Sequence, residues 1–364
     1  MATTPEGLYA SARLDRGKVL RRRLRVLIAS KASPLGAPVC AATTSTALRR
    51  SQPAPAGRAR GCRRQEGEVD VPTKLCDGTG MTEQTALVSP AESGYVALGE
   101  LRMYYEVHGD TADGTPLVLL HGGLFDIEQQ FGALIPELAA GRRVIAVDFQ
   151  GHGRTNDIDR PFSAAAFASD VLGVLDHLAV ERADIHGFSI GGAVALDLAI
   201  DHPERIRRVI VSSTSFAASG MRGSENADAV GAMTVDMIAG TPMEAAYLAK
   251  SPHPDLQHLQ VLLDKLGATY KSGFPDRTED EIRAIAAPTL ITVGDADMVS
   301  LDHAVEFLRL RGGDVNGDFV GVPASQLAVF PGTTHFFGLA RVDLVRDVVV
   351  GFLDAPSSDD GRAG

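Results

Sequence analysis

Cysteine is scarce and unevenly placed in this 364-residue sequence. All three cysteines (Cys40, Cys62 and Cys76) lie before residue 81, so the rest of the chain has none. An odd number of cysteines in one short segment indicates neither a disulfide framework nor a zinc site. The glycine fingerprint of nucleotide-binding folds is also missing. The sequence therefore implies no metal and no organic cofactor.

Long hydrophobic runs are missing as well. No apolar stretch reaches the roughly 18 residues that indicate a membrane-spanning helix. The net charge of −11 argues against a general nucleic-acid binder, because binding the phosphate backbone needs a basic surface. Hydrophobic residues make up 45% and charged residues 22%, the balance of a soluble globular chain. We expect a cytoplasmic protein whose partner is a small-molecule substrate.

The charge is divided unequally between two parts of the chain. Residues 1–80 contain 15 Lys and Arg against 6 Asp and Glu, whereas residues 81–364 contain 20 against 40. In the first part, arginine clusters alternate with proline and small residues, and the few apolar residues have no periodicity. Such a segment cannot bury enough apolar surface to offset the entropy of ordering. We therefore predict a basic, disordered tail over residues 1–80.

Other interpretations of this tail are weaker. The apolar run at 26–29 is shorter than the roughly 7–15 residues of a secretory signal. The Arg and Ser content resembles an organelle transit peptide, although acidic residues count against one. A basic arm that contacts RNA or anionic lipid is a third interpretation. A more ordinary opening starts at Met81, and our hypothesis is that natural translation begins there, which N-terminal sequencing of the native protein would test.

From about residue 95, short β-rich runs alternate with longer helical ones. Residues 162–178 carry apolar side chains three or four apart, which predicts an amphipathic helix. The expected strands are 95–98, 101–107, 116–120, 144–147, 183–186, 209–211, 289–293 and 326–330. This alternation predicts an α/β protein with a mostly parallel sheet flanked by helices.

One long segment interrupts the alternation. Residues 215–286 contain apolar side chains at helical spacing with several Gly and Pro breaks. We interpret this segment as an inserted helical subdomain, called the cap below. The predicted core then consists of residues 95–214 and 287–355.

The most informative motif is G-x-S-x-G, present as Gly187-Phe-Ser189-Ile-Gly191 between an expected strand and an expected helix. A strand-to-helix turn this sharp lifts the serine out of the sheet, and the glycines relieve the crowding. The hydroxyl then lies at a helix N-terminus, whose amides favour developing negative charge. The motif therefore predicts that Ser189 is a nucleophile.

With three further motifs, the chain resembles the α/β-hydrolase fold superfamily from about residue 95 to 355, in its serine-nucleophile members such as esterases, lactonases and perhydrolases. His121-Gly-Gly123 and the segment 148–155 each follow an expected strand, and a late acid precedes a later histidine. The resemblance implies a mostly parallel sheet flanked by helices, with an inserted helical cap.

A serine hydroxyl needs an adjacent base that a carboxylate orients, and this fold places them in the chain order Ser, acid, His. Asp295 and Asp297 both follow the strand after the cap. The resemblance favours Asp297, because family members usually carry Gly-x-x-Asp there, with Asp295 helping to shape the turn. His335 follows the last expected strand and is the expected base.

The only other histidine after the acid is His303. It follows Asp297 too closely to come from a separate loop, and we expect it on a surface helix. The glycine-rich loop 312–317 is an insertion beyond the minimal family pattern and leaves the geometry of this sheet edge open.

Acyl transfer passes through an oxyanion that backbone N–H groups must stabilise. By resemblance, these are the amides of Ile190 and Gly123, with Leu124 as the fallback for the second. Other polar residues near the motifs are expected to hold loops or pack in the core: His121, Asp148, His152 and His186.

These residues predict a serine hydrolase that cleaves a small ester, lactone or thioester through an acyl-enzyme. Haloalkane dehalogenases and epoxide hydrolases need a carboxylate in place of Ser189, and the sequence speaks against both. Cofactor-free perhydrolases and carbon–carbon bond hydrolases use the same triad and stay as alternatives. A non-catalytic ligand-binding protein is the alternative from another class.

Substrate identity depends on the cap, which roofs the site in this fold. The cap has no arginine cluster that would recognise phosphate or a polycarboxylate. A small substrate with a mainly apolar acyl group is the expectation. The candidate lining residues are Met233, Met237, Met243, Leu248, Leu263 and Phe274.

Overall fold

The computed structural model describes residues 89–109, 114–222, 231–272 and 277–356. The predictions for residues 1–80 and for Phe274 lie outside these ranges. No helix within them has both the length and the apolar character needed to cross a membrane.

Eight strands of the described ranges form one sheet in the order β1-β2-β4-β3-β5-β6-β7-β8. Strand β2 is antiparallel to both of its neighbours, β1 and β4. The other strands, β4, β3, β5, β6, β7 and β8 in sheet order, run parallel to one another. The strands are β1 (Glu92–Leu98), β2 (Leu101–His108), β3 (Leu117–Leu120), β4 (Val144–Val147), β5 (Ala183–Phe188), β6 (Ile206–Ser212), β7 (Thr289–Ala296) and β8 (Gln326–Thr334). The predicted mostly parallel sheet is confirmed.

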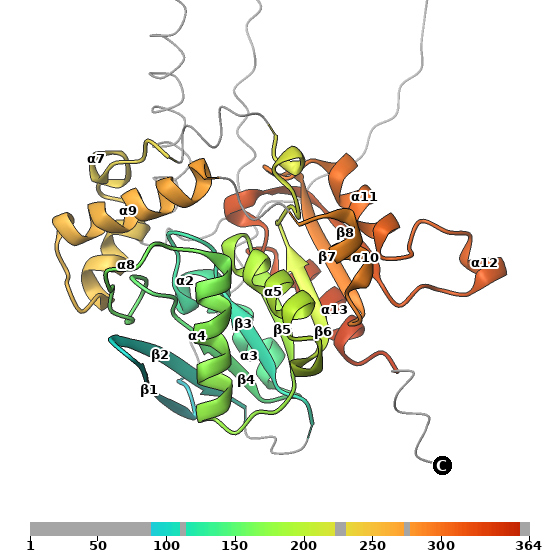
Figure 1. Cartoon of the computed structure of the whole chain (residues 1–364), viewed down its shortest axis with the longest axis horizontal. Coiled ribbons are helices and arrows are strands. Elements are labelled where there is room, and N and C mark those ends of the chain that lie inside the picture. Colours follow the sequence, from blue (N-terminus) through green and yellow to red (C-terminus); the bar gives the residue numbers. More distant parts are fainter. Residues whose placement is uncertain (1–88, 110–113, 223–230, 273–276, 357–364) are drawn as a thin grey trace, which may run out of the picture. The chain divides into compact units, whose positions relative to one another are not determined.

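The central strands are continuous apolar runs because both faces of the sheet are covered. Along β3, Val118 belongs to one buried cluster and Leu119 to the other, as expected when successive side chains point to opposite faces. One cluster includes residues of α4 (Ala164–His177), α5 (Ile190–Asp201) and α11 (Leu301–Leu310). The other includes residues of α2 (Ile127–Phe131), α3 (Ile135–Ala139) and α13 (Val342–Leu353). Figure 1 shows α4 and α5 in front of the strands.

The helix expected over 162–178 is α4. It begins after Ser163, whose side chain accepts a hydrogen bond from the amide of Ala166 and so caps the first turn. Its inner face carries Phe167, Val171 and Val174, all buried. The apolar spacing in the sequence therefore predicted both the helix and the face that packs on the sheet.

Several helices lie between β6 and β7, in the segment proposed as the cap: α7 (Val235–Ile238), α8 (Pro242–Lys250), α9 (Leu256–Lys271) and α10 (Glu279–Ala284), after the short 3-10 helix η2 (Ala218–Gly220). Figure 1 shows α7, α8 and α9 grouped together, whereas α10 packs beside α5 and α11. Helix α9 buries one leucine-rich face, which includes Leu259 and Leu266. We keep residues 215–286 as the proposed cap.

The glycine-rich loop 312–317 leads into the short helix α12 (Gly317–Val320), which projects away from the sheet in Figure 1. The side chain of Phe319 is 86% exposed. Strand β8 nevertheless pairs with β7 from Gln326 onward and reaches Thr334. The insertion therefore leaves the edge of the sheet intact, and His335 follows directly in the 3-10 helix η3 (His335–Phe337).

Candidate active site

Ser189 lies in a sharp turn between β5 and α5. Its backbone has φ 54° and ψ −116°, a strained conformation for a residue with a side chain. The chain passes itself closely here, since a Cβ on Gly187 would lie 2.0 Å from the carbonyl oxygen of Gly191. A Cβ on Gly191 would lie 2.1 Å from the carbonyl oxygen of Leu120. Glycine is therefore required at both positions.

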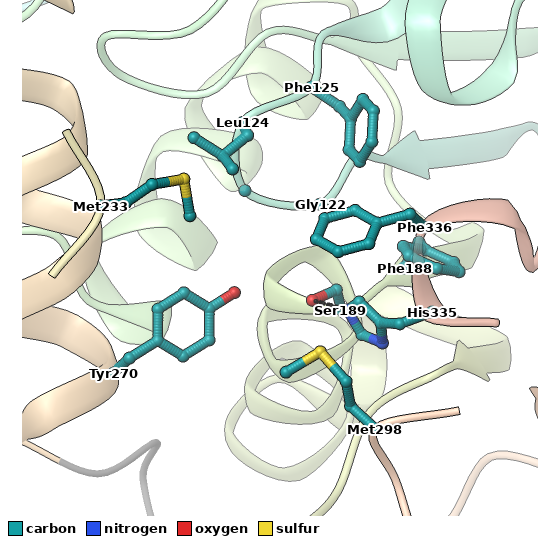
Figure 2. Close-up of a pocket in the computed structure, with 11 residues that line it drawn as sticks. Gly122, Leu124, Phe125, Phe188, Ser189, Met233, Tyr270, Met298, His335 and Phe336 are labelled. Atoms are coloured by element: carbon teal, nitrogen blue, oxygen red, sulfur yellow. Dashed lines mark hydrogen bonds between the residues drawn. The ribbon is translucent and has the colours of Figure 1, made fainter. Parts of the chain in front are cut away.

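The turn brings Ser189 to the carboxyl ends of the parallel strands, where Asp297 and His335 also lie. Oγ of Ser189 is 3.0 Å from Nε2 of His335, and Nδ1 of His335 is 2.9 Å from Oδ1 of Asp297. Figure 2 shows the serine and the histidine together. Three residues that are far apart in the sequence thus form one hydrogen-bonded chain.

The carboxylate of Asp297 is buried and fully engaged. Its oxygens accept hydrogen bonds from the hydroxyl of Ser213 at 2.6 Å and from the amides of Gly294 at 3.3 Å and Val299 at 3.2 Å. Burial acts to raise the pKa of Asp297, but the hydrogen bond and charge of His335, with the hydroxyl of Ser213, hold this pKa below its usual value. The carboxylate is therefore ionised at neutral pH and can orient a histidine.

Asp295, the competing acid, points elsewhere. Its Oδ1 accepts hydrogen bonds from the amides of Gly332 at 2.9 Å and Thr333 at 3.3 Å. It therefore ties the end of β7 to β8 and shapes the turn from which Asp297 reaches His335.

The His-Gly-Gly turn after β3 lies beside the nucleophile. A Cβ on Gly123 would be 3.0 Å from Cδ1 of Ile190, so the two residues proposed to supply amides are neighbours. Leu124 has a positive φ of 70° and, like Gly123, lines the cleft described below. Nδ1 of His121 donates to the carbonyl of Gly122 at 2.8 Å, and its Nε2 accepts from the amide of Phe149 at 3.0 Å. Both ring nitrogens of His121 therefore hold the turn.

The segment 148–155 also has an internal network. Asp148 accepts hydrogen bonds from the amides of Ile127 at 3.0 Å and Arg154 at 2.8 Å. Burial, with the nearby charge of Asp126, raises the pKa of Asp148 to about 7. Nδ1 of His152 donates to the carbonyl of Gln150 at 2.9 Å. These contacts organise the loop, and none of them involves Ser189.

His186 and His303 also lie inside the protein. His186 on β5 is buried, as expected, with Nε2 2.8 Å from Oγ of Ser212. His303 lies on α11, a helix with one exposed face, as expected, but its side chain is on the inner face and only 4% exposed. Its ring stacks on Phe216 with centroids 4.1 Å apart, and its Nε2 accepts from the amide of the same residue. This face of α11 packs against the segment after β6.

A cleft with about 400 Å³ of empty space, part of it open to solvent, lies over Ser189. Figure 2 shows its side chains around the serine. They come from the His-Gly-Gly turn, the Ser189 turn, the cap, the loop after β7 and η3: Gly122, Gly123, Leu124, Phe125, Phe188, Ser189, Met233, Tyr270, Met298, His335 and Phe336. A second, smaller hollow adjoins it beside Ser213, Thr214, Ser215 and Met221. Apolar side chains dominate the larger part.

Of the cap residues predicted to line the cleft, Met233 does so. Met243 and Leu263 are buried in the protein, and Leu248 is exposed. The sequence analysis missed Tyr270 and other lining residues. Helical spacing places Tyr270 four residues after Leu266 on the inner face of α9, but spacing does not indicate that this face meets the serine. In the described ranges, no group of three or more His, Cys, Asp or Glu is placed to hold a metal ion.

Comparison with known proteins matches this chain with hydrolases. A family model described as "alpha/beta hydrolase fold" matches residues 115–242. The 2-hydroxymuconate semialdehyde hydrolase of Pseudomonas sp. (strain CF600) is 38% identical over 109 residues, which are 29% of this chain and 38% of that protein. The chain thus spans about two fifths of the length of that relative.

Solved structures match over a longer part of the chain. Est816, described as an N-acyl homoserine lactone degrading enzyme, is 26% identical with a TM-score of 0.53. The match covers 71% of this chain and 99% of Est816. A meta-cleavage product hydrolase from Pseudomonas fluorescens IP01 is 22% identical with a TM-score of 0.57, over 72% of this chain and 97% of that one. The second likeness concerns the fold alone.

Proposed function

Because the chain belongs to the α/β-hydrolase fold superfamily, we propose that it is a serine hydrolase that cleaves a small ester, lactone or thioester through an acyl-enzyme. Ser189 is the proposed nucleophile, His335 the base and Asp297 the residue that orients the base. One observation carries the proposal: the hydrogen-bonded chain from Oγ of Ser189 through His335 to Asp297, open to an apolar cleft.

The first half-reaction follows from this geometry. Oγ of Ser189 attacks the substrate carbonyl carbon while its proton moves to Nε2 of His335, 3.0 Å away. The buried carboxylate of Asp297 stabilises the imidazolium that forms. Collapse of the tetrahedral intermediate breaks the bond to the leaving group, which takes the proton from His335. The acyl group is then held as an ester on Ser189.

The second half-reaction repeats the same steps with water. His335 takes a proton from water, whose oxygen attacks the acyl carbon, and the proton returns to Oγ of Ser189 as the acid leaves. In both halves an oxyanion develops on the former carbonyl oxygen. We propose that the amides of Ile190 and Gly123 stabilise it, with Leu124 as the alternative to Gly123.

The cleft supports a small and mainly apolar acyl group. Leu124, Phe125, Met233 and Phe336 line its larger part with carbon and sulfur. Such a lining favours an apolar group and provides no charge that would hold a phosphate or a carboxylate. The hollow beside Ser213, Thr214 and Ser215 is more polar and could receive the leaving group.

A second candidate reaction is carbon–carbon bond hydrolysis. It is favoured by the relative named 2-hydroxymuconate semialdehyde hydrolase, which is 38% identical over 109 residues. Peroxide in place of water as the acceptor is a variant on the same triad. A ligand-binding protein without turnover is the candidate from a different class.

Intact-mass measurement after treatment with a fluorophosphonate probe tests the proposal. We expect one adduct on the parent chain and none on Ser189→Ala, since the probe reacts with activated serines. Folded parent that takes up no adduct would contradict the proposal and leave the binding protein. If the parent is labelled, turnover assays separate the two candidate reactions. Multiple turnovers on 4-nitrophenyl esters or simple lactones support ester hydrolysis, and multiple turnovers on a 2-hydroxy-6-oxodienoate support carbon–carbon bond hydrolysis.

A further inference from the structure

A tyrosine from the cap reaches the nucleophile. Tyr270 lies in the last turn of α9, and its partly buried side chain lines both parts of the cleft. Burial raises the pKa of this hydroxyl, and the neighbouring side chain of Ser189 acts to lower it. The same hydroxyl lies 3.6 Å from the position of a Cβ on Gly123. Figure 2 shows it directed into the cleft between the serine and the His-Gly-Gly turn.

Proton counting shows which groups are engaged within the triad before substrate arrives. Asp297 is ionised and accepts, so Nδ1 of His335 carries a proton and Nε2 is the acceptor. The single proton of Ser189 therefore goes to His335. The triad itself takes no proton from Tyr270, whose hydroxyl lies beside the reacting centre before substrate arrives.

Helix α9 holds this donor firmly against the core. One turn before Tyr270, Nζ of Lys265 lies 2.7 Å from Oδ2 of Asp157 and donates to the carbonyl of Ile158 at 2.7 Å. Cδ2 of Leu266 lies 3.0 Å from the Cβ position at Gly123, so the helix packs directly on the His-Gly-Gly turn. A donor on an anchored helix loses little entropy when it binds charge.

We propose that Tyr270 is a further catalytic residue, whose hydroxyl donates a hydrogen bond to the substrate carbonyl oxygen as it becomes an oxyanion. This inference rests on the proposed serine hydrolase activity. The oxyanion site would then consist of two backbone amides from the core and one hydroxyl from the cap, and it would be complete only with the cap in place.

The step transfers no proton from the tyrosine. When Oγ of Ser189 bonds to the carbonyl carbon, negative charge moves to the carbonyl oxygen attached to the same carbon. An oxyanion is a stronger acceptor than a neutral oxygen, so the hydroxyl of Tyr270 donates to it as the charge develops. Burial raises the pKa of Tyr270, so it keeps its proton throughout the neutral range.

The test compares Tyr270→Phe with Tyr247→Phe, a matched change of a cap tyrosine on α8. Steady-state kinetics on a 4-nitrophenyl ester of a short acid should show kcat about 100-fold lower in Tyr270→Phe, the order expected for loss of one oxyanion donor. KM should change less than about threefold, because the hydrogen bond strengthens only in the transition state. Tyr247→Phe should retain the kcat of the parent.

Two further readouts exclude a merely structural role. A boronic acid that forms a tetrahedral adduct on Ser189 should bind Tyr270→Phe more weakly, by about the factor lost in kcat/KM. The loss should be the same for esters with good and poor leaving groups. A loss confined to poor leaving groups would assign Tyr270 to the leaving group and overturn the proposal, as would a kcat equal to that of the parent.

Failure of the inference and failure of the proposed function give different results. If the parent takes up no fluorophosphonate, the serine hydrolase itself is wrong. If the parent is labelled and turns over substrate, and folded Tyr270→Phe does so equally well, only the role of Tyr270 is wrong. Thermal unfolding of both variants establishes that each is folded.

Discussion

Ser213 donates a hydrogen bond from Oγ to Oδ2 of Asp297 at 2.6 Å, on the carboxylate oxygen opposite the one that faces His335. Ser213 directly follows β6, has a positive φ of 51°, and is held by its amide, which donates to the carbonyl of Thr292 at 2.8 Å. The orientation of the proposed catalytic acid therefore depends on the neighbouring strand as well as on its own loop.

Ser213→Ala tests this dependence. Loss of the hydrogen bond should lower kcat/KM about tenfold, which corresponds to about 1.4 kcal/mol, close to the lower end of the range for a hydrogen bond to a charged group. Because this hydrogen bond contributes to the lowered pKa of Asp297, that pKa should rise. The decline of activity at low pH should then begin at a higher pH. Ser93→Ala, which removes an exposed hydroxyl on β1, is the control, and an equal effect of both variants would contradict the account.

The two aspartates after β7 should differ sharply when each is replaced by asparagine. Asp297→Asn should reduce kcat by roughly 10³–10⁴-fold, because an amide can favour the wrong tautomer of His335. Asp295→Asn keeps an oxygen that can accept from the amide of Gly332 and should retain most of the activity. Steady-state kinetics on the two folded variants decide the assignment. Loss of activity in Asp295→Asn alone would reverse it.

The parallel sheet was predictable because its strands are buried on both faces and so appear as short apolar runs. Val118 and Leu119, on opposite faces of β3, are both fully buried. The Ser189 turn was predictable because the close backbone approach at Gly187 and Gly191 excludes any side chain. In both cases the physical constraint acts on residues that are adjacent in the sequence, and therefore it leaves a local pattern.

The lining of the cleft and the location of His303 were not predictable in this way. Tyr270 meets Ser189 because a cap helix packs on the turn at Gly123, and that packing has no local signature. His303 was expected on a surface helix, and that expectation does not specify which face of the helix carries its side chain. Its position four residues before the buried Phe307 indicates the inner face of α11.

Two helical glycines should respond to alanine in opposite directions. In Gly191→Ala the new Cβ would lie 2.1 Å from the carbonyl oxygen of Leu120, so the α5–β3 contact must open. Overpacking of this kind should destabilise the protein by about 3 kcal/mol. In Gly351→Ala, on α13, the Cβ has no atom within 4 Å, and the helix should gain about 0.5–1 kcal/mol. Urea denaturation measures both, and a destabilised Gly351→Ala or an unaffected Gly191→Ala would contradict the packing described for α5.

Three buried histidines should make the protein sensitive to acid. Burial lowers the pKa of His121 to about 4 and that of His186 to about 3, and burial with the neighbouring His121 lowers that of His152 to about 3. In the unfolded chain each takes up a proton near pH 6.5. The unfolded state therefore binds more protons below about pH 6.5, and the free energy of unfolding must fall as the pH drops from there toward the folded pKa values.

His186→Gln isolates one of these protons. Near pH 5 each buried histidine should contribute about 1.4 kcal/mol per pH unit to the slope of unfolding free energy against pH. Removing His186 should reduce the slope by that amount, whatever the variant costs in stability at pH 7. His177→Gln, on the exposed face of α4, should retain the slope of the parent. Urea denaturation between pH 7 and pH 5 gives the slopes. If His186→Gln kept the full slope, the imidazole of His186 would already be protonated in the folded parent protein. The strands that hold the active site would then have to stabilise a positive charge on β5 beside Ser212.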